Sequence, residues 1–326
     1  MEKLKVAVIG VGHLGRYHLE KYLSMPHVEL IGVCDINPER LKEITKKYKV
    51  RGFLDYHDII DMVDAVSIAV PTEVHFEVAM DFLSKGIHIL IEKPITYNLK
   101  DADLLLEKAE KMGVILQVGL VERFNPAVVK MKSLVKDPIF LETHRMNLFT
   151  IRGTDTDVVL DLMIHDIDIV LDTVSAEVED IHAVGMKVIT DKIDIANARI
   201  IFKDGTAANL TASRVSGKML RKIRVFQPDS YISADCGKRK LTIISHDRTR
   251  KDKYGFPKLT SERIEFPDSD PLADEISAFI DAVRGKRPPV VSGKEGRKAL
   301  EVALHIIEEI SQNSKKLNEK CLSQFL

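Results

Sequence analysis

The sequence predicts an α/β domain with a doubly wound parallel sheet, followed by an α+β domain with a mostly antiparallel sheet covered by helices. The chain has 326 residues, which is longer than one hydrophobic core usually supports. Strand and helix patterns alternate up to about residue 120, whereas extended stretches without intervening helices dominate afterwards. We therefore expect the first domain at residues 1–120 and the second at 121–326.

The composition is that of a soluble globular protein, with 45% hydrophobic and 30% charged residues. The formal net charge of -1 provides no general attraction to nucleic acid or to an anionic membrane. No apolar run approaches the roughly 18 residues of a membrane span, so we expect a cytoplasmic protein. Three scattered cysteines, Cys34, Cys236 and Cys321, indicate neither a disulfide framework nor a zinc site, and we expect no metal.

The first strand, at residues 5–9, runs directly into a glycine motif, Gly10-Val11-Gly12-His13-Leu14-Gly15, that opens a helix. A second strand, at residues 28–34, ends in Asp35, about 20 residues beyond the last glycine. This pattern is typical of dinucleotide binding, because the glycines let the pyrophosphate approach the helix N-terminus and the carboxylate binds the adenosine ribose. We expect a cofactor site that includes Gly10, Gly12, His13, Leu14, Gly15 and Asp35.

Asp35 also bears on which dinucleotide binds. A carboxylate accepts hydrogen bonds from a ribose diol but repels a 2'-phosphate, so NAD is favoured over NADP. Arg40 is close enough in sequence to weaken this preference. Asn37 and Pro38 are explained more simply as the N-cap and first-turn proline of the next helix.

The following two strands end in further polar motifs. Residues 65–70 lead into the turn Pro71-Thr72, and the strand at residues 88–92 ends in Glu92-Lys93-Pro94, where the proline stops the strand. In an open parallel sheet, ligands bind outside the carboxyl ends of the strands. We therefore place six further residues beside the cofactor: Val70, Pro71, Thr72, His75, Glu92 and Lys93. Taken alone, a lysine at a strand end is more often solvated, and His75 is equally well explained as a helix-surface residue.

In the second domain, a short helix at residues 127–135 precedes a series of strands. The expected strands are at residues 140–146, 183–189, 195–202, 206–213, 223–227, 231–234 and 241–245, and two amphipathic helices follow at 271–285 and 293–312. One face of such a sheet is covered by helices, and the other is available to a second subunit. We expect a homo-oligomer, a dimer or tetramer, formed through the open face of the sheet.

Gly10-x-Gly12-x-x-Gly15, Asp35, Pro71-Thr72-x-x-His75 and Glu92-Lys93-Pro94, in this order, resemble the glucose-fructose oxidoreductase / inositol dehydrogenase / rhizopine-catabolism (Gfo/Idh/MocA) family. The resemblance covers nearly the whole chain. Many dehydrogenases share the glycine motif, whereas the Glu-Lys-Pro strand end is fairly specific to this family. The resemblance implies an NAD(P)-dependent dehydrogenase that acts on CH–OH groups.

The helical segment at residues 157–173 carries polar residues within its apolar pattern. Asp161 and His165 are i and i+4 on one helix face, and Asp168 lies three residues further on. An intrahelical salt bridge explains such a pair in an arbitrary helix, and a metal site is poorly supported because no Cys or second His is nearby. The resemblance implies instead that Asp161 and His165 face the nicotinamide, with His165 as acid/base and Lys93 completing the site.

This assignment agrees with the chemistry. Oxidation of an alcohol removes a hydride and a proton, and His165 has the side chain whose ordinary pKa is nearest to neutrality. Lys93 would polarise or hold the same oxygen, and a cationic nicotinamide nearby would lower the lysine's pKa. Met163 departs from the family pattern, because many relatives have glycine within this motif, and this puts the shape of the pocket in doubt.

Arginines are concentrated in or just before the second domain, and guanidinium groups form bidentate pairs with phosphates. Surface charge or subunit contacts would explain any single one of them at least as well. The segment from Arg123 to the Ser213-Arg214 loop resembles the branch of the family that oxidises nucleotide-diphosphate sugars, notably UDP-N-acetylglucosamine at C3, to keto sugars. We expect four residues to contact such a substrate: Arg123, Asn125, Arg152 and Arg214.

Other activities remain open from the sequence. The same fold serves inositol and free-sugar dehydrogenases, and also biliverdin reductases, which need a broad apolar pocket. A non-catalytic cofactor-sensing regulator of this fold need not keep Lys93, Asp161 and His165, and this chain has all three. The residues specify neither the sugar nor the direction of the reaction.

Overall fold

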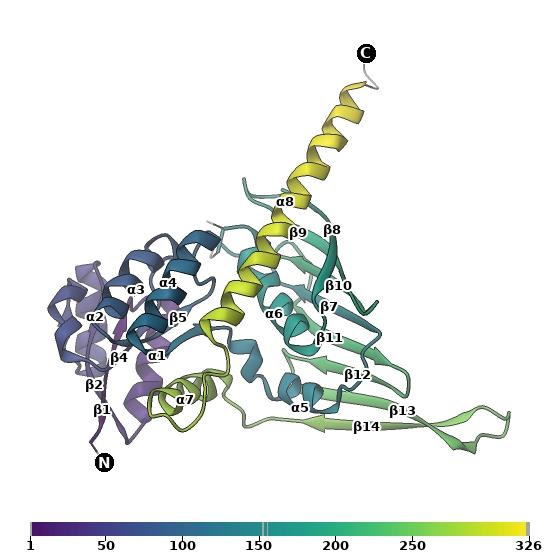
Figure 1. The fold of residues 1–326 in the computed structure, drawn as a ribbon, viewed down its shortest axis with the longest axis horizontal. Coiled ribbons are helices and arrows are strands. Elements are labelled where there is room, and N and C mark those ends of the chain that lie inside the picture. Colours follow the sequence, from purple (N-terminus) through teal and green to yellow (C-terminus); the bar gives the residue numbers. More distant parts are fainter. Residues whose placement is uncertain (1, 152, 155, 324–326) are drawn as a thin grey trace. The chain divides into compact units, whose positions relative to one another are not determined.

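The computed structural model describes residues 2–151, 153, 154 and 156–323. The chain forms two compact units (Figure 1). One consists of the residues up to Val121 together with Asp270–Leu300, and the other of Glu122–Ser269 together with the chain from Glu301 onward. The sequence analysis predicts the first boundary near residue 120. The segment Asp270–Leu300, however, belongs to the first unit and not to the second domain predicted at residues 121–326.

The first unit contains the predicted parallel sheet, in the order β3-β2-β1-β4-β5-β6. The strands are β1 (Leu4–Ile9), β2 (Val28–Cys34), β3 (Gly52–Phe53), β4 (Ala65–Ile68), β5 (His88–Glu92) and β6 (Leu116–Gly119). The helices are α1 (His13–Ser24), α2 (Pro38–Tyr48), α3 (His75–Ser84) and α4 (Leu99–Met112), with short 3-10 turns at Tyr56–Asp58, Ile60–Met62 and Thr72–Val74. The strand order reverses between β1 and β4, so the carboxyl ends of these strands flank the crevice where doubly wound sheets bind ligands.

Helix boundaries in this unit follow from their end residues. The side chain of Asn37 accepts hydrogen bonds from the backbone N–H groups of Glu39 and Arg40, and Pro38 is the first helical residue of α2. Gly113 ends α4 with a φ of 65°, a left-handed conformation that glycine adopts without a steric penalty. The predicted cap of α2 is therefore present in the structure.

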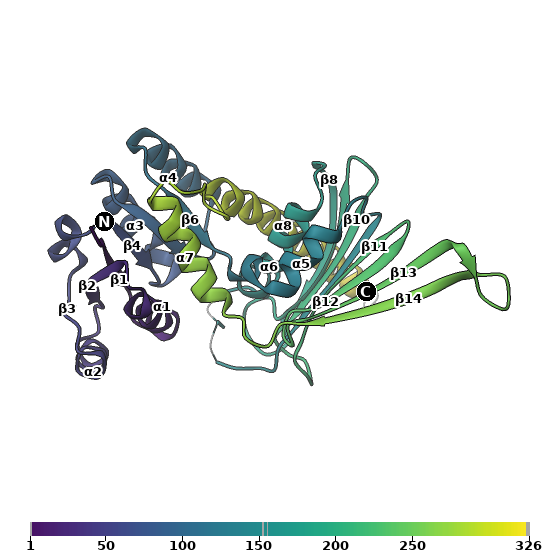
Figure 2. The same ribbon diagram turned by 90° about the horizontal axis from the view of Figure 1, so that it is seen from below.

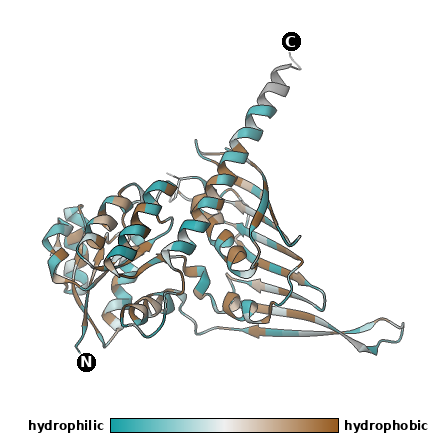
Figure 3. Cartoon of the chain, viewed as in Figure 1, coloured by the Kyte–Doolittle hydropathy of each residue, from teal (hydrophilic) through white to brown (hydrophobic). Residues whose placement is uncertain are grey.

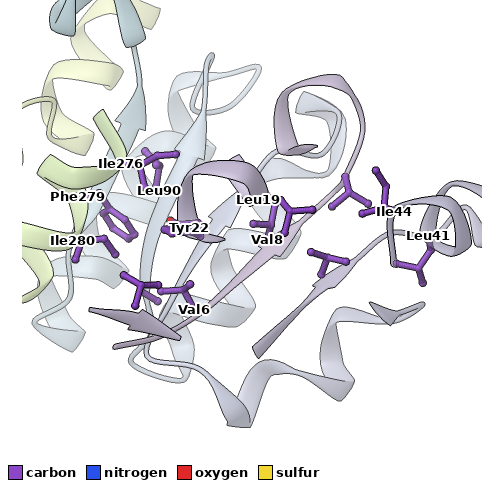
Figure 4. Packing of buried hydrophobic residues seen from close by; sticks show 14 residues of the cluster. Val6, Val8, Leu19, Tyr22, Leu41, Ile44, Leu90, Ile276, Phe279 and Ile280 are labelled. Carbon is purple, nitrogen blue, oxygen red and sulfur yellow. The ribbon is translucent and has the colours of Figure 1, made fainter. Parts of the chain in front are cut away.

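Helix α7 (Pro271–Val283) belongs to this unit because it completes the core. Ile276 and Phe279 are fully buried in one cluster with Tyr22 and Leu90, as Figure 4 shows. Burial of each large apolar side chain stabilises a fold by about 1.5–3 kcal/mol. The apolar stripe of α7 was recognisable in the sequence, but a stripe does not reveal which of two cores it will join.

The second unit contains an eight-stranded sheet in the order β14-β13-β12-β11-β7-β10-β9-β8. All neighbours are antiparallel except β7 and β10, which are parallel. The strands are β7 (Phe140–Met146), β8 (Val178–Met186), β9 (Ile195–Phe202), β10 (Ala207–Ser213), β11 (Leu220–Gln227), β12 (Ser230–Asp235), β13 (Lys240–Lys251) and β14 (Pro257–Glu265). The mostly antiparallel sheet agrees with the sequence prediction, but β14 was not predicted. Nearly all of its residues are exposed, so it lacks the apolar alternation that identifies strands.

Helices cover one face of this sheet (Figure 2). They are α5 (Pro126–Leu134), α6 (Ile164–Thr173) and the part of α8 (Gly293–Ser323) from Glu301 onward, and a 3-10 turn spans Val121–Phe124. In β9, Ala196, Ala198 and Ile200 are buried, whereas Asn197 and Arg199 between them are exposed. Figure 3 shows both hydrophobic and hydrophilic segments along the strands of this sheet. Within the described residues, no helix combines the length and apolar character needed to cross a membrane.

Candidate active site

The glycine motif after β1 is shaped by close backbone contacts. A Cβ at Gly15 would lie 1.8 Å from the carbonyl oxygen of Gly10, and one at Gly10 would lie 2.6 Å from that of Ala69. Gly10 also has a φ of +84°. Gly12, by contrast, has no neighbouring atom within 4 Å of such a Cβ. Two glycines therefore permit the tight turn, and the third leaves open space of the kind a pyrophosphate needs.

Asp35 lies directly after β2 and is buried. Its Oδ2 accepts a hydrogen bond of 3.0 Å from the backbone N–H of Val11, and its Oδ1 accepts one of 2.9 Å from Asn37. The carboxylate thus links the end of β2 to the glycine motif. The half-exposed Arg40 places its Nη1 3.1 Å from Oδ2, so the guanidinium balances part of the negative charge at this point.

His75, at the start of α3, is buried, so its interpretation as a helix-surface residue is wrong. Its Nδ1 lies 2.9 Å from the carbonyl oxygen of Pro94 and its Nε2 lies 3.0 Å from that of Val70. Burial lowers the pKa of His75, although the two carbonyl groups and Glu92 act in the opposite direction. A neutral imidazole has one N–H and donates to only one of these oxygens. His75 therefore lies between the turns that follow β4 and β5, and Thr72 begins the short turn just before it.

A chain of buried polar side chains holds the end of β5. His18 of α1 places its Nε2 3.0 Å from Oε1 of Glu92 and its Nδ1 3.0 Å from Oγ of Ser67. The hydroxyl of Tyr22 lies 2.7 Å from the same Ser67 oxygen. The other carboxylate oxygen of Glu92 lies 3.4 Å from the backbone nitrogen of Lys93. This chain fixes Glu92 at the base of the turn that carries Lys93.

Sequence reasoning missed three residues of this hydrogen-bonded series of side chains, namely His18, Tyr22 and Ser67. The available signal was a histidine and a tyrosine at i and i+4 in α1 and a serine within the buried strand β4. Burial alone would raise the pKa of Glu92, but the His18 hydrogen bond and the charges of His18 and Lys93 hold it below its ordinary value. Glu92 is therefore an anion close to the Lys93 ammonium group.

In the second unit, Asp161 and His165 lie on the segment predicted as one regular helix. Its first part, Val159–Met163, is a π-helical turn, and α6 follows from Ile164. Single π-helical turns occur frequently at functional sites, because they redirect the side chains that they carry. Asp161 and His165 are both partly exposed, whereas the neighbouring Ile164 and Ile167 are buried. The side chains of Asp161 and His165 are thus partly accessible.

The loop before this segment lies against Asp161. Gly153 has a φ of +77°, and a Cβ there would lie 2.7 Å from Oδ2 of Asp161. Arg214 holds this loop, because its Nη1 and Nη2 each donate a 2.7 Å hydrogen bond, to the carbonyl oxygens of Gly153 and Thr156. We predicted Arg214 as a substrate contact, and these bonds give it a structural role beside Asp161. Arg152, predicted with it, lies outside the described residues.

The other two predicted substrate contacts are also engaged within the protein. Arg123 is buried and donates from Nε and Nη2 to the two oxygens of Asp168, at 2.7 and 2.9 Å, while its Nη1 lies 2.8 Å from Asp172. Asn125 caps α5 and donates to Glu122. The structure thus brings Asp168 to Arg123, and the contacts of Arg123 and Asn125 stabilise the second unit.

A pocket of about 370 Å³ lies in the second unit, next to the loop that contacts Asp161. It is lined by Phe149, Ile151, Thr154, Ile189, Thr190, Asp191 and Lys192. Asp194 shapes one wall, because its Oδ2 accepts hydrogen bonds from the backbone N–H groups of Val188, Ile189 and Thr190. Burial alone would raise the pKa of Asp194, but these bonds and the Thr190 hydroxyl hold it far below its ordinary value.

Comparison with known proteins places these features in one family. A model described as an oxidoreductase family with an NAD-binding Rossmann fold matches residues 4–120. The UDP-N-acetylglucosamine 3-dehydrogenase of Acidithiobacillus ferrooxidans is 38% identical over 94% of this chain and 97% of its own length. A solved structure of that enzyme, GnnA, superposes with a TM-score of 0.87 at 37% identity and covers 95% of this chain and 98% of the other. The myo-inositol 2-dehydrogenase of Thermotoga maritima is 29% identical over 91% of this chain and 93% of that protein.

Proposed function

Because the chain belongs to the Gfo/Idh/MocA family of NAD-binding Rossmann oxidoreductases, we propose that it oxidises the C3 hydroxyl of UDP-N-acetylglucosamine to a keto sugar, with NAD as the acceptor. The observation that carries this proposal is the 38% identity to a UDP-N-acetylglucosamine 3-dehydrogenase along nearly the whole of both chains. The retained Lys93, Asp161 and His165 favour an enzyme over a non-catalytic regulator of the same fold.

The residues of the first unit fit a dinucleotide. The open space at Gly12, next to the tight turn of Gly10 and Gly15, suits a pyrophosphate, and His13 and Leu14 provide the helix N-terminus. Asp35 would bind the adenosine ribose. The turns after β4 and β5 would hold the nicotinamide side, through Val70, Pro71, Thr72, His75, Glu92 and Lys93. When bound, NAD supplies the acceptor for the hydride.

The remaining steps belong to side chains of this protein. His165 takes the proton of the reacting hydroxyl, because imidazole is the side-chain group whose ordinary pKa lies nearest to neutrality. Asp161, four residues earlier, favours the imidazolium that results. The Lys93 ammonium group stabilises negative charge on the same oxygen.

The pocket in the second unit suits the nucleotide end of the substrate. Its loop lies against Asp161, Phe149 offers an aromatic face to a base, and Lys192 offers a positive charge to a diphosphate. Arg152 remains a proposed contact from the sequence. The engaged guanidinium groups of Arg123 and Arg214 support a structural role for those two residues.

NAD is proposed over NADP on the strength of Asp35. Assembly through the open face of the eight-stranded sheet and a cytoplasmic location stay predictions.

A second candidate activity, oxidation of free inositol, has support in the 29% identity to the Thermotoga myo-inositol 2-dehydrogenase.

A panel of UDP-sugars, free sugars and inositols, scored by NADH formation with a carbonyl trap present, tests the proposal. We expect turnover of UDP-N-acetylglucosamine. Turnover of free inositol or glucose, with none of any nucleotide sugar, would refute the substrate assignment and leave the family unchanged. The absence of any absorbance change with biliverdin and NADH would exclude the bilin-reducing alternative.

A further inference from the structure

Glu275 of α7 is a fully buried acidic residue in the first unit. Within the described part of the chain, neither of its carboxyl oxygens has a hydrogen-bond partner. Its backbone carbonyl accepts a 3.1 Å hydrogen bond from Nε2 of Gln117. An ionised carboxylate is very costly to bury without a partner, whereas a neutral carboxyl group that donates its proton is tolerated.

The nearest polar groups are those that hold the end of β5. One carboxyl oxygen of Glu275 lies within 4.8 Å both of a ring nitrogen of His18 and of a carboxylate oxygen of Glu92. Tyr22 is a further titratable group that interacts electrostatically with Glu275. Lys93 interacts in the same way with Glu92. Two buried carboxyl groups this close to each other do not both ionise.

Packing fixes α7 at this position. The residue after Glu275 is Ile276, which is fully buried in the same cluster as Leu90 of β5, two residues before Glu92. Figure 4 shows Ile276 and Leu90 beside each other. On the neighbouring strand, a Cβ at Gly119 would lie 3.1 Å from Oε2 of Glu92, so the glycine leaves room for this carboxylate.

We propose that Glu275 is a positioning residue of the candidate active site: its neutral carboxyl group, within 4.8 Å of a Glu92 oxygen, directs its O–H dipole at that carboxylate and thereby holds the turn that carries Lys93. Burial, followed by the negative charge of Glu92, raises the pKa of Glu275 well above its ordinary value, while Glu92 is held ionised. The pair thus carries one negative charge. Glu275 acts through Glu92 and does not touch the substrate.

The proposal rests on the proposed function only for the role of Lys93, so its test begins with measurements that need no sugar. Glu275→Gln keeps the shape and an N–H donor but cannot ionise, whereas Glu275→Leu removes the donor. Glu110→Gln removes a carboxylate from an exposed position of α4 in the same unit and serves as the control. Melting temperature and NADH affinity are followed from pH 5 to pH 10, and kcat and KM are then measured with the sugar that the enzyme turns over.

For Glu275→Gln we expect kcat within about twofold of the wild type. Its melting temperature should fall less as the pH rises from 5, because the unfolded wild-type chain releases the Glu275 proton above about pH 4, whereas the folded protein, in which the pKa of Glu275 is raised, keeps it. For Glu275→Leu we expect kcat to fall by about tenfold or more with NADH affinity within a few-fold, the pattern of a displaced catalytic group. If Glu275→Leu does not fold, the pH dependence of the melting temperature of Glu275→Gln, compared with that of Glu110→Gln, decides.

Three outcomes would overturn the proposal. The first is a Glu275→Gln variant as inactive as Glu275→Leu, because the carboxylate charge would then be required. The second is a pH dependence of the melting temperature of Glu275→Gln that coincides with that of the wild type and of Glu110→Gln. The third is a stoichiometric divalent metal that the wild-type protein retains on dialysis and the Glu275→Gln protein lacks. If no sugar in the panel is turned over, only the substrate assignment is refuted. The stability measurements still test the role of Glu275.

Discussion

The Nη1 atom of Arg40 lies 3.1 Å from the Asp35 carboxylate, at the point where the ribose of a dinucleotide would bind. A carboxylate here favours the diol of NAD, whereas a nearby arginine is the usual partner of the 2'-phosphate of NADP. In this chain the two side chains pair with each other, so part of the arginine charge is already balanced.

We predict that NADH raises the melting temperature more than NADPH at equal concentration. A ligand at 100 times its Kd stabilises a protein by about 2.7 kcal/mol, so thermal shift resolves the difference readily. Asp35→Ala is expected to remove the preference, because Arg40 is then released toward a phosphate. A larger shift of the wild-type protein with NADPH would contradict the cofactor assignment.

Replacing either proposed catalytic group is expected to abolish turnover but not cofactor binding. Lys93→Met and His165→Ala should each lower kcat by roughly 100- to 10,000-fold, the usual cost of losing a general acid or base, with NADH affinity within a few-fold. Lys85→Met and His182→Ala, at exposed positions in the first and second unit, are the matched controls. Near-full activity of either catalytic variant on the true substrate would refute that residue's role.

The pocket beside the Asp161 loop predicts an effect on substrate binding. Lys192→Gln should raise KM for UDP-N-acetylglucosamine by about tenfold while kcat changes little, since an interaction equal in ground and transition states affects KM alone. Lys187→Gln, an exposed lysine in the same stretch of chain, should behave as the wild type. An unchanged KM in Lys192→Gln would refute the assignment of the substrate's diphosphate to this pocket.

Asp194 makes the stability of the second unit depend on pH. Its folded-state pKa lies below the value in the unfolded chain, so its contribution is fully present above about pH 4 and is lost as the pH falls further. Asp194→Asn should cost about 2–3 kcal/mol at pH 7, because a charged acceptor of several hydrogen bonds is lost. In melting experiments the gap between the two proteins should narrow toward pH 3, with Asp191→Asn as the exposed control. A gap that stays constant across this range would show that the charge is not the cause.

The sequence was most informative where local chemistry determines structure. The glycine motif, the Asn37 cap and the strand end at Glu92 each act through their nearest neighbours, and the structure places them as expected. The partners of Glu92 were not predictable in this way, because His18 reaches it from α1 and is itself held by Ser67 of β4. Strand β14 was missed because its residues are nearly all exposed, and the partners of Arg123 and Arg214 depend on tertiary contacts that spacing does not encode.

Helix α7 belongs to the first unit but is synthesised after residues 122–269, and this order affects how the first unit folds during biosynthesis. The polypeptide that emerges first, up to Val121, contains every strand of the parallel sheet but lacks the helix that buries Tyr22 and Leu90. The ribosome must add the whole of Glu122–Ser269 before that helix is available. During this interval the nascent chain carries an apolar surface without its cover, of the kind that chaperones bind and that promotes aggregation. A chain terminated before Asp270 would keep that surface permanently, so nonsense mutations far from the dinucleotide motif would still eliminate a stable cofactor-binding unit.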